Sequence, residues 1–210
     1  MFPRAPDSGP VVRQSIRRAT LLLLFFLVGC ATTRSISLPD FPDWESRKTV
    51  LTETDQWEFA GRIGVSAAEE GFNGKLWWRQ DGTVFRARIS GPLGIGTVFI
   101  NGNRGELTVT DNHGKVTRLE DAETDLRKLY GWTIPVTSLR FWALGIPDPS
   151  SPADVTLIDP GQLSQVRQGG WQVDIREYRE GGGQPMPRRL TAVNGDMKVR
   201  LVVDEWTFRQ

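Results

Sequence analysis

Alternation of apolar and polar residues is the feature that most constrains how this chain of 210 residues folds. A period of two places successive side chains on opposite faces of a strand, so each alternating run predicts a strand with one buried face. The clearest alternating runs lie at 57–65, 85–89, 107–109, 171–175 and 197–201. After Val203 the pattern slips by one residue, so that Trp206 and Phe208 continue the apolar face. One extra residue near Asp204 would explain the slip, which predicts a β-bulge there.

Turn signals separate the alternating runs. Each contains Asn or Asp followed directly or after one residue by Gly, and they lie at 73–74, 81–82, 101–102, 112–114 and 194–195. Asn-Gly and Asp-Gly pairs are typical of hairpin turns, and connections this short favour antiparallel neighbours. The sequence therefore predicts a mainly β fold of ten or eleven short strands in a highly curved sheet or barrel, whose closure would protect its edges.

Two helices are predicted outside the main apolar pattern. The first covers 43–51, with Asp43 as its N-cap and with Trp44 and Leu51 on one side. The second covers 121–130, where acidic residues come first and Arg127 and Lys128 come last. That order of charges complements the helix dipole.

A third helix is predicted at 138–145, capped by Thr137 or Ser138 and ended by Gly145 and Pro147. Its apolar residues recur at helical spacing and predict one buried stripe, made of Leu139, Trp142, Ala143 and Ile146. The stripe fits plain core packing, and it fits equally a helix that covers the opening of a barrel.

The N-terminus has the pattern of an export signal. Three basic residues, Arg13, Arg17 and Arg18, precede a largely apolar stretch at 19–28. This stretch is shorter than the roughly 20 apolar residues that a spanning helix needs, which is typical of a removable signal peptide.

The signal ends in Leu-Val-Gly-Cys at 27–30, which resembles the bacterial lipobox. In that motif the cysteine receives an S-diacylglycerol and, after cleavage, an N-acyl chain. The alternative is a small buried core cysteine, but Cys30 is the only cysteine and lies where the motif requires it. In enteric lipoproteins an Asp directly after the lipidated cysteine signals retention in the inner membrane. This chain has Ala31 at that position, which predicts that the protein is anchored in the outer membrane and faces the periplasm. We therefore expect a signal peptide at 1–29, a lipidated end and flexible tether at 30–42 and a folded domain at 43–210.

Composition excludes several classes of function. Residues 1–29 hold four of the 26 basic and one of the 25 acidic residues, so the remainder carries a net charge of about −2. With no basic run and no nucleic-acid-binding signature, we expect no nucleic-acid partner. The eight Trp residues all follow Cys30 and suit a core, a binding cavity or a membrane interface.

No catalytic residue and no metal site is predicted. The single His, His113, lies in a turn sequence, and one His without a second Cys makes a zinc site improbable. The chain has no Gly-x-Ser-x-Gly element. The one catalytic arrangement that the sequence does not exclude is a pair of carboxylates like that of glycosidases, because Asp and Glu are plentiful.

Several segments together resemble the LolB family. They include Leu-Trp-Trp at 76–78 and Phe-Arg-Ala-Arg-Ile-Ser-Gly-Pro-Leu-Gly at 85–94. The likeness continues at 134–136, 138–140, Trp142, 144–147, 171–173, Tyr178, 186–187 and Trp206. It covers nearly the whole mature chain and departs from the family in the signal peptide, the tether, the 150–169 connection and the Ile-Gly continuation at 95–96.

This resemblance implies a fold and a function. The fold is a half-open antiparallel β-barrel of about 11 strands, LolA/LolB-like, with helices that cover its mouth as a lid. Such a protein, expected to be a monomer, takes lipoprotein cargo from the periplasmic carrier LolA and releases it into outer-membrane phospholipid, without nucleotide, metal or other cofactor. The family's loop leucine maps onto Leu93, between Pro92 and Gly94, and is tied to membrane insertion. The alternative for Leu93 is a turn leucine folded back onto the core.

The acyl chains would lie against the apolar inner face of the barrel. The residues predicted there are Trp57, Phe59, Trp78, Ile89, Phe99, Trp142, Trp171, Val173 and Leu201, although a register error of one residue moves a strand's whole set to the other face. Two other functions fit the pattern: a lipocalin-like binder of other lipids, and a structural envelope lipoprotein with a filled interior. An apolar cavity of several hundred Å³ would separate the lipid-binding functions from the structural one.

Overall fold

The computed structural model describes residues 35–67, 70–92, 96–103, 106–130, 133–159 and 161–209. The predicted signal peptide and Cys30 lie outside the described residues, and so do Leu93 and Gly94.

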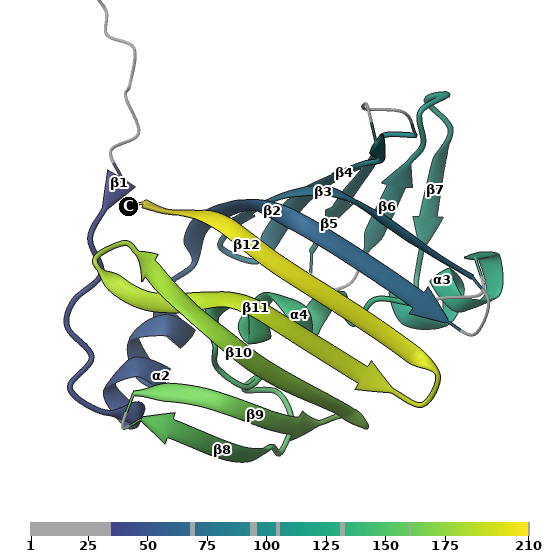
Figure 1. The fold of residues 1–210 in the computed structure, drawn as a ribbon. Helices are drawn as coiled ribbons and strands as arrows, with labels where there is room; N and C mark the ends of the chain where they lie inside the picture. Colours follow the sequence, from purple (N-terminus) through teal and green to yellow (C-terminus); the bar gives the residue numbers. More distant parts are fainter. Residues whose placement is uncertain are drawn as a thin grey trace, which may run out of the picture. The chain divides into compact units, whose positions relative to one another are not determined.

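Within this part of the chain, twelve strands form one antiparallel sheet (Figure 1). The strand order is β7-β6-β5-β4-β3-β2-β12-β11-β10-β9-β8, and β1 pairs with β12 beside this path. Each half of the sheet is a meander of hairpin neighbours, and the two halves meet where β2 pairs with β12. The strands are β1 (Ser35–Ile36), β2 (Gln56–Ala67), β3 (Glu70–Asp81), β4 (Val84–Ser90), β5 (Val98–Gly102), β6 (Leu107–Thr110), β7 (Val116–Leu119), β8 (Asp154–Asp159), β9 (Gln162–Gln168), β10 (Trp171–Gly181), β11 (Gln184–Asn194) and β12 (Met197–Arg209).

Three helices accompany the sheet among the described residues: α2 (Trp44–Glu53), α3 (Ala122–Tyr130) and α4 (Val136–Leu144). Figure 1 shows α4 behind β11 and β12, on the inner side of the curved sheet. None of the three has the length and apolar character that crossing a membrane requires. The sheet stays open, because β7 and β8 end the strand order without pairing with each other. The predicted mainly β, half-open fold is thereby confirmed.

The alternation predicted from the sequence matches the burial of the strands. In β2 the buried side chains are those of Trp57, Phe59, Ile63, Val65 and Ala67, all at odd positions. The same agreement holds for β4, β6 and the first half of β10. One face of the sheet therefore forms a continuous apolar core, and the other face is polar.

Three of the five predicted turns are confirmed, at 82–83, 112–113 and 195–196. The other two predictions were wrong, because Asn73-Gly74 lies inside β3 and Asn101-Gly102 lies at the end of β5. A Cβ on Gly74 would lie 2.6 Å from the Ser90 carbonyl oxygen, and one on Gly102 would overlap the Phe85 ring. These glycines permit close packing within the sheet, a use that the dipeptide alone does not distinguish from a turn.

The helix predictions are confirmed in position and corrected in detail. Asp43 caps α2, since its Oδ1 accepts the backbone N–H of Ser46 at 2.8 Å. Helix α4, however, begins at Val136, and neither Thr137 nor Ser138 caps it. Its burial is also not confined to one stripe, since Val136, Phe141 and Leu144 are buried as well. A helix inside a curved sheet loses its solvent-exposed face, which explains why the stripe was too narrow a prediction.

The flexible tether predicted at 30–42 is shorter than expected. Ser35 and Ile36 pair with Arg209 and Phe208 of β12, and the Leu38 N–H donates to the Gly182 carbonyl oxygen at 2.7 Å. Leu38 is buried. This segment lacks periodicity because it crosses several elements in turn, so only tertiary contacts reveal that it is ordered.

The β-bulge predicted near Asp204 is confirmed. Gly61 pairs with Val203 and Ala60 pairs with Glu205, which leaves Asp204 as the extra residue. The two strands approach closely at this point, since a Cβ on Gly61 would overlap the Val202 carbonyl oxygen. Gly61 is therefore required where β2 meets β12.

We expect Gly61→Ala to lower the free energy of unfolding by about 1–3 kcal/mol or more, because the new methyl group has no space beside the backbone of β12. Gly64→Ala is the matched control in the same strand, where the nearest atom to a new Cβ lies 3.8 Å away. It should be neutral, or stabilising by about 0.5–1 kcal/mol. Urea denaturation measures both variants. Equal effects of the two substitutions would contradict the close approach.

Candidate functional site

The inner face of the sheet carries a cluster of aromatic rings from β2, β3 and β4. The Trp57 ring lies 6.1 Å from Phe59 and 6.4 Å from Trp78, with interplanar angles of 11° and 13°. Trp78 stacks on Phe85 with ring centroids 4.6 Å apart. These side chains lie on neighbouring strands and on one face, where aromatic pairs contribute beyond their buried area. They form a broad apolar surface inside the half-barrel.

Strand β12 completes this aromatic surface. Trp206 meets the rings of Trp57 and Phe59 edge-on, at centroid distances of 5.7 and 5.2 Å, and stacks on Phe208. The Trp206 Nε1–H donates to the Pro187 carbonyl oxygen at 3.3 Å. The ring can lie against the apolar cluster because its polar atom has a partner on β11.

Helix α4 covers the inner face over β10 and β11, and its Phe141 and Leu144 line a pocket together with Trp57 of β2. Its Trp142 lies 6.2 Å from Trp171 of β10. Leu139, Trp142 and Leu144 are all buried. Gly145, in the left-handed conformation that ends α4, lies beside Pro187 and Tyr178, so the helix end rests directly on β10 and β11.

A single buried amide, Gln168 of β9, holds α4 and the segment after it. Its Oε1 accepts the Trp142 Nε1–H at 3.0 Å and the Asp148 N–H at 2.9 Å. Its Nε2 donates to the carbonyl oxygens of Asp148 and Ser151 at 2.7 and 2.8 Å. The amide thus uses two acceptor and two donor positions, which are all that the group offers. Ser138 adds a further link, donating to Asp148 Oδ2 at 2.9 Å.

Helix α2 closes one end of the half-barrel through a buried cation. The Arg47 guanidinium donates to the Pro185 carbonyl oxygen at 2.7 Å and lies over the rings of Phe41 and Tyr178. Burial lowers the pKa of Arg47 and raises the pKa of Tyr178 to about 12, and the Tyr178 hydroxyl donates to the Leu163 carbonyl oxygen at 2.8 Å. These groups have structural partners and serve packing.

The described side chains of the inner face pack into one buried apolar core. The pocket that reaches Trp57, Phe141 and Leu144 has a volume of about 160 Å³. This is smaller than the roughly 300–1,000 Å³ of typical small-molecule sites. The larger hollows, of about 590 and 700 Å³, open on the surface beside α2 and on the outer face of β4–β6.

Eight of the nine residues predicted for the inner face are buried there. Trp57, Phe59, Trp78, Trp142 and Trp171 belong to the two aromatic groups described above, and Ile89, Val173 and Leu201 lie on the same face. Phe99 is the exception and requires a correction. It is 46% exposed on the outer face, and Ile100 takes the inner position between Ala87 and Val109. Three consecutive apolar residues at 98–100 left the register of this strand ambiguous.

The loop that carries Leu93 begins and ends at described residues. Pro92 is exposed, and the hydroxyl groups of Ser90 and Thr97 lie 3.2 Å apart at the base of the loop.

His113 is exposed at a hairpin tip, where its backbone N–H donates to Asp111 Oδ1. In the part of the chain that the structure describes, no three His, Cys, Asp or Glu side chains gather closely enough to hold a metal ion.

The fold is similar to that of LolA superfamily proteins. It matches the crystal structure of a LolA superfamily protein from Nitrosomonas europaea with a TM-score of 0.50, covering 81% of this chain and 95% of that one. Sequence identity is 9%, so the match shows the fold alone.

The sequence identifies the family within that class. The profile described as outer membrane lipoprotein LolB matches residues 55–206. The outer-membrane lipoprotein LolB of Aeromonas hydrophila is 31% identical over 193 residues, covering 92% of this chain and 97% of its own. Those of Pseudomonas aeruginosa and Pseudomonas fluorescens are 32% and 35% identical over 191 residues, each covering more than 85% of both chains. The chain therefore belongs to the LolB family, which confirms the predicted family and the predicted outer-membrane location.

We expect Gln168→Ala to lower the free energy of unfolding by about 2–4 kcal/mol, because it leaves two buried N–H groups and two carbonyl oxygens without partners. Gln165→Ala, in the same strand, removes only a partly buried hydrogen bond to Asp174 and should cost about 1 kcal/mol or less. Chemical denaturation compares the two. If Gln168→Ala were no worse than Gln165→Ala, the amide would not be what holds α4.

Proposed function

We propose that this lipoprotein accepts lipoproteins from the periplasmic carrier LolA, shelters their acyl chains in its apolar interior and inserts them into the phospholipid of the outer membrane. The lipid on Cys30 would anchor it, facing the periplasm. It would act by binding and release, without catalysis, nucleotide, metal or other cofactor.

The observation that carries this proposal is the continuous apolar inner face beneath α4. Each methylene group moved from lipid to water costs about 0.8 kcal/mol, so three exposed acyl chains would cost roughly 30 kcal/mol or more. Cargo of this kind crosses an aqueous compartment only inside an apolar shelter. The surface built by Trp57, Phe59 and Trp78 has the chemistry for that shelter, and α4 supplies its cover.

We expect loading to require a cover that can leave, because the described side chains of α4 and of the inner face are packed into one buried core. Helix α4 suits this role because apolar packing and a few hydrogen bonds, centred on Gln168, hold it in place. Acyl chains would replace α4 against the aromatic surface, so that apolar contacts are exchanged and not lost. With no energy source, the receptor must bind cargo more tightly than the carrier does, and the bilayer more tightly still.

In the delivery of cargo to the membrane, Leu93 would have a role of its own, separate from that of the interior. Exposing a leucine costs only about 1.5–3 kcal/mol relative to burying it, so a loop can present one to lipid cheaply. Pro92 and Gly94 flank the residue and favour a turn. We expect the loop to contact the bilayer while cargo leaves the interior.

A transfer assay tests the proposal. Residues 34–210 form one compact unit, so a soluble form that begins at Ala31 retains the fold. This form, its Leu93→Glu variant and a control variant, Leu157→Glu at an exposed position on β8, would each receive radiolabelled lipoprotein bound to LolA in the presence of liposomes. We expect all three to accept cargo, and only Leu93→Glu to deliver at least about tenfold less to the liposomes, since a charge in the bilayer is costly.

Two outcomes would contradict the proposal. If none of the forms takes cargo from LolA, the receptor function is wrong, and a binder of other lipids becomes the better hypothesis. If Leu157→Glu fails in delivery as badly as Leu93→Glu, the loop has no special role.

A further inference from the structure

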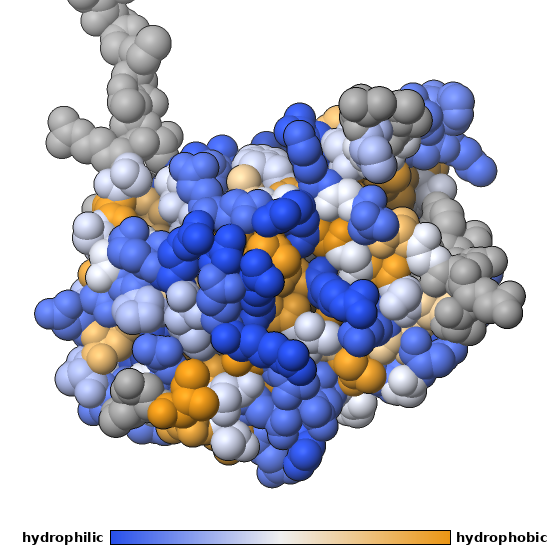
Figure 2. All heavy atoms as spheres, in the orientation of Figure 1, coloured by the Kyte–Doolittle hydropathy of each residue, from blue (hydrophilic) through white to orange (hydrophobic). Residues whose placement is uncertain are grey.

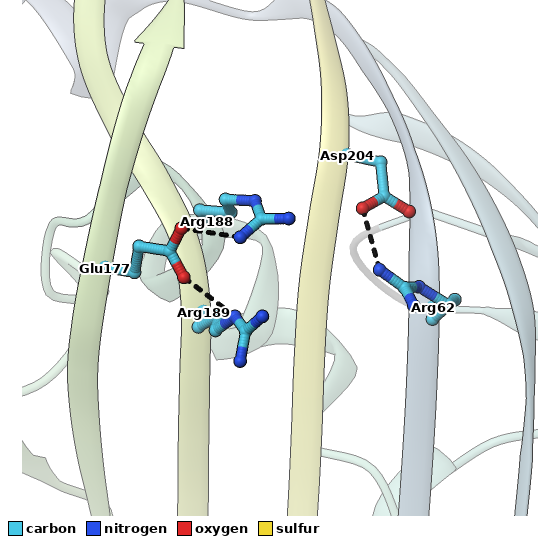
Figure 3. A network of polar contacts seen from close by, with 5 residues as sticks. All are labelled: Arg62, Glu177, Arg188, Arg189 and Asp204. Atoms are coloured by element: carbon cyan, nitrogen blue, oxygen red, sulfur yellow. Dashed lines mark hydrogen bonds and ion pairs between the residues drawn. The ribbon is translucent and has the colours of Figure 1, made fainter.

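The outer face of the sheet is polar, but its charges are unevenly distributed. Over β10, β11, β12 and β2 hydrophilic side chains predominate, with small hydrophobic areas between them (Figure 2). Here Arg62, Arg188 and Arg189 have acidic partners. Glu177 binds Arg188 and Arg189 at 2.5 and 2.7 Å, and Asp204 binds Arg62 at 2.9 Å (Figure 3). The hydrogen bond from Arg188 holds the pKa of Glu177 below its usual value, so this pairing persists in mildly acidic solution.

Strands β3 and β4 differ in degree, because all of their outward basic residues lack an ion pair within the described residues, whereas β10, β11 and β12 carry both paired and unpaired ones. Lys75, Arg79, Arg86 and Arg88 alternate with the buried side chains of these strands. None of the four forms an ion pair within the described part of the chain. The only acidic residues in β3 and β4 are Glu70 and Asp81, at the two ends of β3.

The pairing of these strands brings like charges together. Arg79 lies opposite Arg86 on β4 and opposite Glu58 on β2, and Lys75 lies opposite Arg62, which binds Asp204. Like charges that face each other across a strand pair are destabilising. An anionic partner would relieve the repulsion between Arg79 and Arg86.

Aromatic side chains accompany the charges. Trp77, Arg88 and Phe99 form one cross-strand row over β3, β4 and β5, so that the basic residue lies on the strand between the two aromatic ones. Phe99 is 46% exposed although the opposite face of the sheet offers an apolar core. Aromatic and long basic side chains together are typical of surfaces that lie at the boundary between water and lipid.

The row lies beside the loop of Leu93. Arg88 is two residues before Ser90, where the loop begins, and Phe99 is two residues after Thr97, where it ends. A hollow of about 700 Å³ opens there, and its lining includes Arg88, Ser90, Thr97, Phe99 and Thr110, together with one carboxylate, Asp111, whose Oδ1 accepts the backbone N–H groups of His113 and Lys115. Hydroxyl groups and a guanidinium around an open hollow offer hydrogen bonds to a phosphate group.

We infer that the outer face of β3, β4 and β5 is a membrane-docking face that binds anionic phospholipid, with the Trp77–Arg88–Phe99 row at the headgroup level. The inference rests on the proposed function, because it places this face against the bilayer that receives the cargo. Since only residues 31–34 separate Cys30 from β1, the fully extended link spans no more than roughly 18 Å, and the domain stays within reach of the membrane surface. Docking by this face would present the Leu93 loop to the bilayer.

Vesicle binding tests the docking face directly. The form that begins at Ala31 would be mixed with vesicles of phosphatidylcholine alone and of phosphatidylcholine with phosphatidylglycerol. We expect binding only to the anionic vesicles, weakened by salt. The double variant Arg86→Glu and Arg88→Glu should bind about tenfold more weakly or worse, because each basic residue near an anionic surface adds roughly fivefold in affinity.

Two controls test whether weaker vesicle binding reflects only the change in net charge or a loss of the fold. Arg167→Glu with Arg176→Glu makes the same change in net charge on β9 and β10 and should leave vesicle binding within about twofold of the wild type. Arg86→Glu also places an acid opposite Arg79, so the double variant should melt at no lower a temperature than the wild type.

The outcomes distinguish this inference from the proposed function. If Arg86→Glu with Arg88→Glu binds anionic vesicles like the wild type, the docking face is wrong, while delivery that depends on Leu93 can still stand. If the variant binds vesicles normally but no longer takes cargo from LolA, the face binds the carrier protein and not lipid. Loss of vesicle binding with normal acceptance of cargo supports the docking face, whatever Leu93→Glu does.

Discussion

The pairing of β2 with β12 is the interaction on which the rest of the structure depends. All other neighbours in the main strand order are hairpin partners, whereas this pair joins residues near 60 to residues near 200. It converts two separate meanders into one curved sheet with a single inner face. The pair accommodates a bulge at Asp204, and Gly61 lets the two backbones approach there. Without that extra residue, Trp206 and Phe208 would lie on the outer face, and the inner aromatic surface would lose its β12 side.

The inner face then determines how α4 is held. An aromatic surface excludes water, so every polar group that approaches it needs a protein partner. Trp142, Trp206 and Tyr178 each direct one polar atom to such a partner at the rim of the surface: Gln168, the Pro187 carbonyl and the Leu163 carbonyl. At this rim the hydrogen bond from Trp142 to Gln168 links α4 to β9, while the buried apolar residues of the helix pack without directional contacts. Under the proposed function, acyl chains would replace the apolar contacts of this cover, and the hydrogen bonds of Gln168 would favour its return.

The sequence predicted the elements that follow a local rule and missed those that depend on distant contacts. Alternation identified the buried positions of β2, β4 and β10, and the phase slip located the bulge, because a period of two reports directly on the faces of a strand. It failed at Phe99, where three consecutive apolar residues fit both registers. Gly74 and Gly102 were assigned to turns because close packing and tight turns favour the same residue. Gln168 gave no signal at all, since its importance depends on Trp142 and Asp148, which are distant in sequence and reach it only in the folded chain.

Strand β4 connects the two proposed activities, because its alternate residues belong to different surfaces. Phe85, Ala87 and Ile89 lie in the apolar interior, whereas Arg86 and Arg88 point outward. The strand leads directly into the segment that contains Leu93, so residues of the inner surface, residues of the outer surface and Leu93 lie within about ten residues of one another along the chain. A rigid strand with two chemically distinct faces can therefore hold cargo on one side while the other side lies against an anionic bilayer. In this arrangement the geometry of delivery follows from the pleat of the sheet, and only the cover over the interior has to move.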